Sequence, residues 1–211
     1  MKNTIRYRAQ TKAKYALLLG VFLLVPLISF QAHAASLNLF SSSSTKSTDL
    51  SAFAKWTRVV QQGQVSSAQD WPSLLSHPTR SNQVQTLKAI NQQVNSYRYI
   101  EDKDGWKTPD YWATPDQFFK KGGGDCEDYA IVKYMALKAL GWNPNNMRIV
   151  VLQDIKLNQL HSVLAVNFNG ETYILDNQLS YLASDRDIRH YVPIYSINEH
   201  AWWRHHPSRK A

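Results

Sequence analysis

The sequence has only one cysteine, Cys126, among its 211 residues. A disulfide within the chain is therefore excluded, and the thiol is free, paired with another chain, or reactive. After about residue 30, the sequence also lacks any apolar run near the ~20 residues that a membrane-spanning helix needs. No internal repeat with a period of about 20 to 50 residues is present, which excludes solenoid and propeller folds.

Residues 1–34 show the order of segments that is typical of a secretory signal peptide. An apolar run, Tyr15–Phe30, lies between a basic start and the small-residue motif Ala32-His33-Ala34. We expect cleavage after Ala34 and export of the remainder. An uncleaved membrane anchor is the alternative, and Pro26 and the short length of the run argue against it.

The charge balance does not indicate a nucleic-acid partner. The formal net charge of +8 includes five basic residues before Ala34, and no acidic residue lies in that segment, so export leaves a net charge of +3. An excess of this size is too small to indicate nucleic-acid binding. After the signal peptide, we expect a flexible leader over residues 35–47, because Ser41–Thr45 is a polar run, and then one domain over residues 48–211.

Hydrophobic spacing predicts two helices in the first half of this domain. They cover about residues 48–62 and a segment that begins with Ser81 or Asn82 as its cap and runs to about Tyr97. Residues 102–117 contain two Thr-Pro steps and predict an ordered, irregular loop. Its aromatic residues are expected mainly to cover the core.

The second half of the chain predicts strands. The β-branched content indicates strands over residues 147–155 and 191–197. Between them, two alternating runs flank Asn169-Gly170, which is typical of a β-hairpin with a two-residue turn. That turn places His161 and Asp176 diagonally on one face, at about 7–8 Å, a separation that long side chains bridge. A three-residue turn would move Asp176 to the other face.

Cys126 lies where a further helix is predicted to begin. It follows three glycines in the stretch KKGGGDCEDYAIVKYMALKALGW, Lys120–Trp142, whose apolar run ends at Gly141. The dipole and free N–H groups of a first helical turn lower the pKa of a thiol and favour the reactive thiolate. The same N–H groups can stabilise an oxyanion, and the glycines allow close approach of the backbone to a substrate.

Cys126, His161 and Asp176 together provide the parts of an acyl-transfer triad: a nucleophile, a general acid/base and an orienting carboxylate. Each residue alone has a simpler interpretation, namely a small buried thiol, a surface histidine and a strand-end cap. Their combination on a helix start and on the following hairpin favours catalysis.

The block GGGDCEDYAIVKYMALKALGW, followed by HSVLAV and YILDNQ and preceded by a loop rich in Trp and Tyr, resembles the bacterial transglutaminase-like cysteine proteases of the LapG type. The resemblance covers nearly the whole domain. It implies an α+β fold with a papain-like core, in which the catalytic cysteine begins a central helix packed on an antiparallel sheet that carries the histidine and the aspartate. Cys126, His161 and Asp176 fall where this family has its triad.

The resemblance also implies a function and partners. The expected protein is a periplasmic protease that cuts a large surface adhesin near its N-terminus, at a di-alanine site, so that the adhesin is released and the biofilm disperses. The expected inhibitory partner is an inner-membrane receptor that senses cyclic di-GMP.

The acidic neighbours of Cys126 have a place in this resemblance, because the family is calcium-dependent. Carboxylates beside a thiolate should raise its pKa and oppose activation. A bound Ca²⁺ would reverse that field, and the resemblance implies Asp125 and Glu127 as ligands, while Asp128 is left open. The alternative is a cluster of acids that merely suits a helix N-terminus. Asp102 and Asp104 (EDKDG) are interpreted as a solvated loop.

Two other functions stay open from the sequence. One keeps the triad but transfers the acyl group to an amine, as a transglutaminase does, since the residues do not distinguish water from an amine as acceptor. The other is a non-catalytic, exported calcium-binding protein whose thiol is structural.

Overall fold

The computed structural model describes residues 38–63 and 82–206. By its contacts, the chain divides into two compact units, Met1–Ala35 and Ser36–Ala211, and every described residue belongs to the second unit. The expected signal peptide, residues 1–34, lies outside the described residues. Within the described ranges, no helix combines the length and the apolar character needed to span a bilayer.

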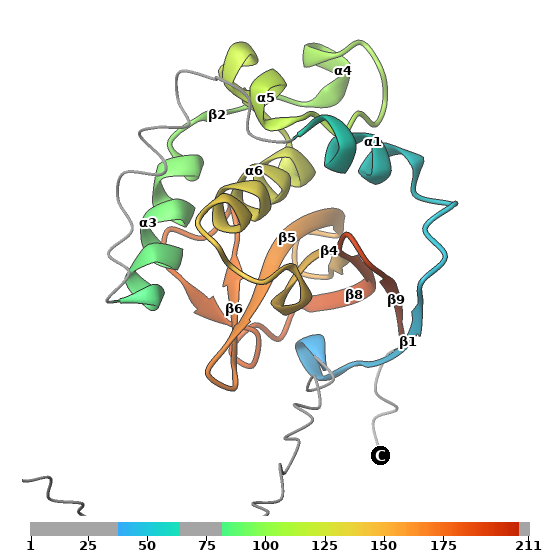
Figure 1. Ribbon diagram of the computed structural model, residues 1–211, viewed down its shortest axis with the longest axis vertical. Coiled ribbons are helices and arrows are strands. Elements are labelled where there is room, and N and C mark those ends of the chain that lie inside the picture. Colours follow the sequence, from blue (N-terminus) through green and yellow to red (C-terminus); the bar gives the residue numbers. More distant parts are fainter. Residues whose placement is uncertain (1–37, 64–81, 207–211) are drawn as a thin grey trace, which may run out of the picture. The chain divides into compact units, whose positions relative to one another are not determined.

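Seven strands form one antiparallel sheet in the order β1-β9-β8-β4-β5-β6-β7 (Figure 1). These strands are β1 (Ser43–Ser47), β4 (Met147–Asp154), β5 (Gln159–Phe168), β6 (Glu171–Leu175), β7 (Ala183–Ser184), β8 (Tyr191–Ile197) and β9 (Trp202–His206). Two short parallel strands, β2 (Arg98–Tyr99) and β3 (Gly123–Gly124), make a second sheet. The strands predicted over residues 147–155 and 191–197 are thereby confirmed.

The central helix is α6 (Cys126–Ala139), which packs on β5 and β4 and also contacts two other helices, α3 and α5 (Figure 1). Its residues Asp128–Leu137 are all buried, as the apolar sequence predicts. The remaining helical segments are α1 (Ala54–Gln62), α3 (Gln83–Asn95), α4 (Asp102–Gly105), α5 (Pro115–Lys121) and two 3₁₀ turns, η1 (Leu39–Ser41) and η2 (Pro144–Asn146). This arrangement of helices with an antiparallel sheet is the α+β class expected from the sequence.

The sheet separates two apolar cores. Along β5, Leu164 and Val166 belong to the larger core, to which α6 contributes, whereas Val163 and Ala165 belong to a smaller core with Leu39. This alternation follows from the two-residue period of a strand, which directs successive side chains to opposite faces.

The β5–β6 hairpin has the predicted two-residue turn. Asn169 and Gly170 have φ angles of 51° and 78°, the left-handed values that a type I′ turn requires. Phe168 pairs with Glu171, and the register continues as far as Leu164 and Leu175. The predicted register of this hairpin is therefore confirmed.

Residues 38–47 differ from the flexible leader that the sequence suggests. Strand β1 pairs with β9 along its whole length, and Ser42 Oγ lies 2.8 Å from Nδ1 of His205. Leu39 is fully buried in the smaller core. The polar run is ordered because its backbone groups complete the sheet edge, and that pairing does not depend on apolar side chains.

The predicted loop over residues 102–117 is also more regular than expected. It contains the short helix α4, and its second Thr-Pro step begins α5. Thr114 and Gln117 form a capping box at that helix start, and Pro115 occupies a first-turn position, where its missing N–H costs nothing. Proline therefore marks a helix start here instead of a loop.

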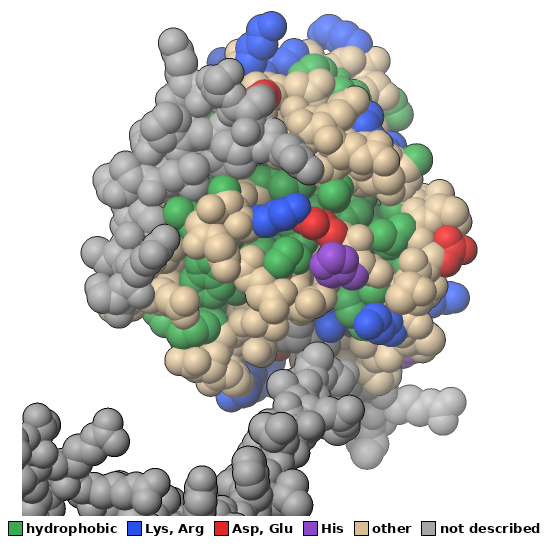
Figure 2. Space-filling view, viewed as in Figure 1, with side chains coloured by type: hydrophobic (Ala, Val, Ile, Leu, Met, Phe, Trp, Pro, Cys, Tyr) green, Lys and Arg blue, Asp and Glu red, His purple; other side chains and the backbone are tan. Residues whose placement is uncertain are grey.

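Figure 2 shows how charge is distributed on the face that is also seen in Figure 1. Among the described residues of this face, Lys and Arg side chains lie in small groups, mainly at the upper edge and lower right of the view, and apolar, acidic and histidine side chains lie between these groups. This face carries no continuous block of one charge.

Candidate active site and metal centre

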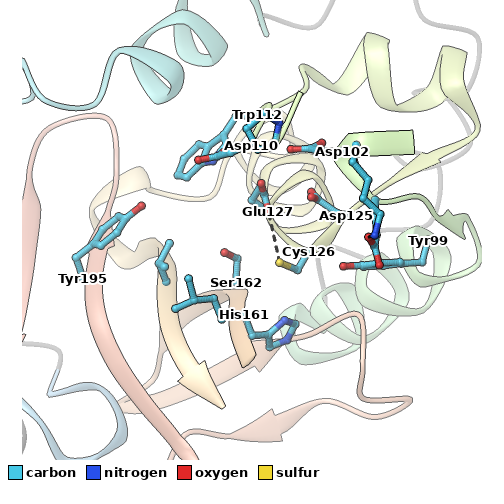
Figure 3. A pocket seen from close by; sticks show the side chains of 15 residues that line it. Tyr99, Asp102, Asp110, Trp112, Asp125, Cys126, Glu127, His161, Ser162 and Tyr195 are labelled. Atoms are coloured by element: carbon cyan, nitrogen blue, oxygen red, sulfur yellow. Dashed lines mark hydrogen bonds and ion pairs between the residues drawn. The ribbon is translucent and has the colours of Figure 1, made fainter. Parts of the chain in front are cut away.

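Cys126 is the first residue of α6 and lines a pocket of about 510 Å³ (Figure 3). Asp125, the residue before it, has extended backbone angles and acts as the N-cap without a side-chain hydrogen bond. Sγ of Cys126 donates a hydrogen bond to Oε2 of Glu127 at 3.2 Å. The thiol thus occupies the predicted helix start, and its hydrogen-bond partner there is an acid.

The glycines before Cys126 serve close packing more than access for a substrate. A Cβ on Gly123 would lie 1.8 Å from the carbonyl oxygen of Arg98, and one on Gly124 would lie 2.3 Å from Oδ2 of Asp128. Both glycines are buried in β3. They bring β3 against β2 and leave room for the Asp128 carboxylate beside the turn that precedes Cys126.

His161 and Asp176 form a buried pair, as the hairpin register predicts. Nε2 of His161 lies 2.9 Å from Oδ1 of Asp176, and the two side chains are 1% and 0% exposed. The same oxygen accepts from the backbone N–H of Gln178 at 2.8 Å, and Oδ2 accepts from the hydroxyl of Tyr191 at 2.7 Å. Burial raises the pKa of Asp176, but these hydrogen bonds outweigh burial and hold the pKa below its usual value.

His161 reaches the Cys126 pocket from the edge of the sheet. By register it shares a strand face with Val163, which belongs to the smaller core. Strand β6 pairs with β5 only as far as Leu164, and beyond this point the side chains of Asp176 and Gln178 contact the imidazole of His161. The imidazole lines the same pocket as Cys126, and Figure 3 shows Ser162 beside Cys126 in this pocket, with His161 below them.

Gln178 and Tyr191 complete the surroundings of the pair. Nε2 of Gln178 lies 3.4 Å from Nδ1 of His161, so a neutral imidazole would carry its proton on Nε2, toward Asp176. Gln178 ends the segment YILDNQ that follows the hairpin turn, whereas no sequence pattern identified Tyr191. Tyr191 opens β8, fifteen positions after Asp176, and no local pattern connects the two residues.

Carboxylates gather on the other side of Cys126. Oxygen atoms of Asp102, Asp125 and Asp128 lie within 4.8 Å of one another, and Asp102 forms a second such group with Asp110 and Glu127. The interpretation of Asp102 as solvated is wrong, because its side chain is 3% exposed and accepts a hydrogen bond from the backbone N–H of Tyr111. Asp104, two residues later, is exposed, as expected.

This crowding shifts the pKa values of the acids upward. Burial, followed by the charges of Glu127 and Asp128, raises the pKa of Asp125 to about 10. Burial raises that of Asp102 to about 6, although the Tyr111 N–H opposes the shift. The pKa of Asp128 is raised by burial as well, with partial opposition from the N–H of Ala113.

The pKa of the Cys126 thiol is raised for the same reasons. Burial and then the charges of Glu127 and Asp125 raise the pKa of Cys126 well above its usual value, and a hydrogen bond with Ser162 opposes this only in part. In this electrostatic environment the neutral thiol is favoured over the nucleophilic thiolate.

The donor set of this cluster fits a hard divalent cation. One oxygen each of Asp102, Asp125 and Asp128 is buried and has no hydrogen-bond partner among the described residues. Buried carboxylate oxygens are costly unless a partner or a metal compensates them, and carboxylates are the ligands that Ca²⁺ prefers. Asp125, which the sequence analysis named, lies in the cluster with Asp102 and Asp128, and Glu127 lies beside it.

Comparison with known proteins agrees with this geometry. Residues 51–209 match the family described as bacterial transglutaminase-like cysteine proteinase BTLCP. The structure of LapG from Legionella pneumophila is 29% identical over 70% of this chain and 86% of its own, with a TM-score of 0.58. Calcium-bound LapG from the same organism is 28% identical over 74% of this chain and 92% of its own, also with a TM-score of 0.58.

A curated relative from Pyrococcus horikoshii, a UPF0252 protein, is 33% identical over 76 residues. This match covers 36% of the chain, which spans only 24% of that relative's length. The match over residues 51–209 is far more extensive, and it covers most of the described residues. The chain therefore belongs to the bacterial transglutaminase-like cysteine proteinases.

Proposed function

We propose that this protein is a calcium-dependent cysteine endopeptidase, with Cys126 as nucleophile, His161 as general acid/base and Asp176 as the residue that orients the imidazole. The observation that carries the proposal is the buried His161–Asp176 hydrogen bond of 2.9 Å, whose histidine lines the same pocket as Cys126. Membership in a cysteine proteinase family makes peptide hydrolysis the expected outcome of this chemistry.

The hydrogen bonds of the imidazole support a role for each of its nitrogens. Because Nε2 of His161 donates to Asp176, Nδ1 is the nitrogen that accepts the thiol proton. The resulting thiolate attacks the scissile carbonyl, and N–H groups at the start of α6 stabilise the oxyanion. His161 then returns the proton to the leaving amine, and the acyl-enzyme on Cys126 is hydrolysed by water that His161 deprotonates.

Calcium would be held by Asp125 and Glu127, with Asp102 and Asp128 as further ligands that the cluster supports. The bound ion would supply positive charge beside the thiol, where the acids otherwise disfavour the thiolate. Glu127 has two competing roles, because its Oε2 now accepts the hydrogen bond of Cys126 Sγ. Engagement of Glu127 by a cation would release the thiol for His161. The similarity to calcium-bound and EGTA-treated LapG supports calcium as the ion.

The substrate in this proposal is a large surface adhesin, cut near its N-terminus at a di-alanine site in the periplasm, with release of the adhesin and dispersal of the biofilm. The regulator is an inner-membrane receptor for cyclic di-GMP that binds the protease. The proposed substrate and the proposed regulator rest on the resemblance to LapG-type proteases and on the similarity to Legionella pneumophila LapG, which covers 86% of the LapG chain.

The test is incubation of the exported chain with the N-terminal region of a candidate adhesin, with calcium or with EGTA. We expect cleavage only with calcium and none by Cys126→Ala or His161→Ala. His200→Ala, which removes an exposed histidine, is the matched control and should cleave normally. Mass spectrometry of the products separates the alternatives: a crosslink with loss of ammonia and an uncut chain would indicate a transglutaminase. Full cleavage by folded Cys126→Ala would contradict the catalytic assignment altogether.

A further inference from the structure

Lys133 is a buried cation that the proposed mechanism does not use. Its side chain is 0% exposed, and Nζ has no hydrogen-bond partner among the described residues. Burial lowers its pKa to about 7, and the charge of Asp176 acts in the opposite direction. A lysine is almost never fully buried unless it is paired, so this side chain calls for a physical explanation.

The position of Lys133 points it toward the contact between α6 and α3. It follows Cys126 by seven residues, or about two helical turns, and so lies on a related face of α6. Nζ lies 5.7 Å from the ring centroid of Tyr129, one turn earlier. The hydroxyl of Tyr129 donates to the carbonyl of Tyr97 at 2.6 Å, just after α3 ends. Tyr129 therefore contacts the chain just after α3, a helix that packs against α6, and Lys133 follows Tyr129 by one turn on the same face of α6.

Two asparagines of α3 hold the segment that carries Asp176. Nδ2 of Asn95 donates to the carbonyl of Asp176 at 2.7 Å and to that of Leu179 at 3.2 Å. Nδ2 of Asn91, one turn earlier, lies 3.5 Å from the carbonyl of Leu179. These contacts fasten the backbone of residues 176–179 to α3, directly beside the carboxylate that orients His161.

The same two asparagines leave their acceptor atoms unpaired. Oδ1 of Asn91 and Oδ1 of Asn95 are buried without a hydrogen-bond partner among the described residues, as is Oδ1 of Asn177. An ammonium group has three donors and no acceptor, and an amide oxygen only accepts. The unpaired donor of α6 and the unpaired acceptors of α3 do not bond directly, but one enclosed water molecule can accept from the first and donate to the second.

We propose that Lys133 is a positioning residue for the His161–Asp176 pair. No direct hydrogen bond joins these groups among the described residues, so the contact runs through one enclosed water molecule, which accepts from the Lys133 amino group and donates to the amide oxygens of Asn91 and Asn95. That contact fixes which way each amide faces, so that Nδ2 stays directed at the carbonyls of residues 176–179. The chain of contacts runs from α6 through α3 to the Asp176 backbone and then to the imidazole. This role rests on the proposed function, since it concerns the same catalytic pair.

The test compares two replacements of Lys133. Lys133→Met keeps the length of the side chain but removes its donors, and Lys133→Gln keeps an N–H donor without charge. We expect Lys133→Met to lower kcat by about 10- to 100-fold with little change in KM, because a small displacement of a catalytic group has effects of this size. Lys133→Gln should recover most of the loss. The proton of the His161–Asp176 hydrogen bond, followed by NMR, should shift in Lys133→Met alone.

Two controls separate positioning from loss of stability. Lys138→Met removes a lysine of α6 that pairs with Glu199, and Ile131→Val weakens the buried part of α6 without removing a polar group. Both should keep kcat and the NMR signal of the pair. Wild-type kcat in folded Lys133→Met would overturn the proposal. The proposal would also be overturned if kcat fell equally in Lys133→Met and Lys133→Gln while the NMR signal of the His161–Asp176 proton stayed unchanged. That result would indicate that Lys133 only fills space.

A measurement on the wild-type protein needs neither activity nor a folded variant. The Lys133 side chain is titrated by NMR while the side-chain amide signals of Asn91 and Asn95 are observed. Amide signals that move together with the Lys133 titration support the contact, and signals that do not respond overturn it. Because this result is independent of cleavage, failure of the proposed function and failure of the Lys133 assignment remain distinguishable.

Discussion

The buried position of Asp102 leads to a prediction that tests the metal centre by one substitution and a neighbouring control. Asp102→Asn keeps an oxygen for the N–H of Tyr111 but removes a charge and a hard ligand from the cluster. Asp104→Asn makes the same chemical change two residues later in α4, at an exposed position. We expect the first substitution to weaken calcium binding and the second to leave it unchanged.

The size of the effect follows from binding linkage. Calcium at about 100 times its Kd stabilises the folded state by about 2.7 kcal/mol, if it does not bind the unfolded chain. For a domain of this size, that amounts to a rise in Tm of roughly 5 to 11 °C. Loss of one ligand that weakens binding about tenfold removes about 1.4 kcal/mol, which is half of this stabilisation. The calcium-induced rise in Tm should therefore fall by about half in Asp102→Asn.

Without calcium, the same substitution should stabilise the protein. Folding raises the pKa of Asp102 from 3.8 to about 6, so the ionised side chain favours the unfolded state at every pH above that range. The penalty grows as the pH rises from about 4 to 6 and is constant above it. Allowing for solvent screening, removal of the charge at pH 7.5 should be worth about 1 to 2 kcal/mol. Asp102→Asn should then melt higher than the wild type in EGTA.

The assay is thermal unfolding of wild type, Asp102→Asn and Asp104→Asn, each in saturating calcium and in EGTA at pH 7.5. We expect two changes in Asp102→Asn only: calcium raises the Tm by a smaller amount than in the wild type, and the Tm in EGTA is higher than that of the wild type. A full calcium shift in Asp102→Asn, or an equal loss in Asp104→Asn, would refute the placement of Asp102 in the metal centre.

Three further predictions concern the same site. Tyr191→Phe removes the hydroxyl that donates to Oδ2 of Asp176. Urea titration should show that the free energy of unfolding falls by about 1.5 to 3 kcal/mol, and kcat should fall as well. An unchanged free energy of unfolding and an unchanged kcat would argue against a role for this hydroxyl. The folded-state pKa of Asp176 is lowered, so the ionised carboxylate stabilises the fold above pH ~4, and this stabilisation is lost as the pH falls below that value. The urea midpoint of Asp176→Asn should therefore depend less on pH than that of the wild type between about pH 5 and 2. The same pH dependence in both proteins would contradict this. Gly124→Ala places a methyl group 2.3 Å from Oδ2 of Asp128. Calorimetry should show weaker calcium binding and a free energy of unfolding that is lower by about 1 to 3 kcal/mol. In the control Gly141→Ala, the added methyl group meets no atom within 4 Å, and calcium binding should be unchanged.

The parts of the site that the sequence predicted depend on local rules. A two-residue turn at Asn169-Gly170 fixes the register of a hairpin, and that register brings His161 to Asp176. The start of α6 at Cys126 likewise follows from glycines before an apolar run. In both cases the decisive contacts are close in sequence or are set by a turn.

The parts that were missed depend on contacts between distant segments. Asp102 belongs to a charged stretch that reads as solvated, and its burial results from the N–H of Tyr111 and from the approach of Asp128 on α6. Strand β1 has no apolar alternation, because its place in the sheet depends on the backbone of β9. Periodicity does not report interactions of these kinds.

The pairing of β1 with β9 has a consequence for the order in which the protein is completed. Ser43 pairs with His206 and Ser47 with Trp202, so the first strand of the described chain has its partner in the last one. During synthesis, β1 must wait for its partner until β9 has been made. Contacts of such long range are slow to form, because a large loop has to close first. A chain that is threaded across a membrane as it emerges would therefore reach the far side before its sheet could close.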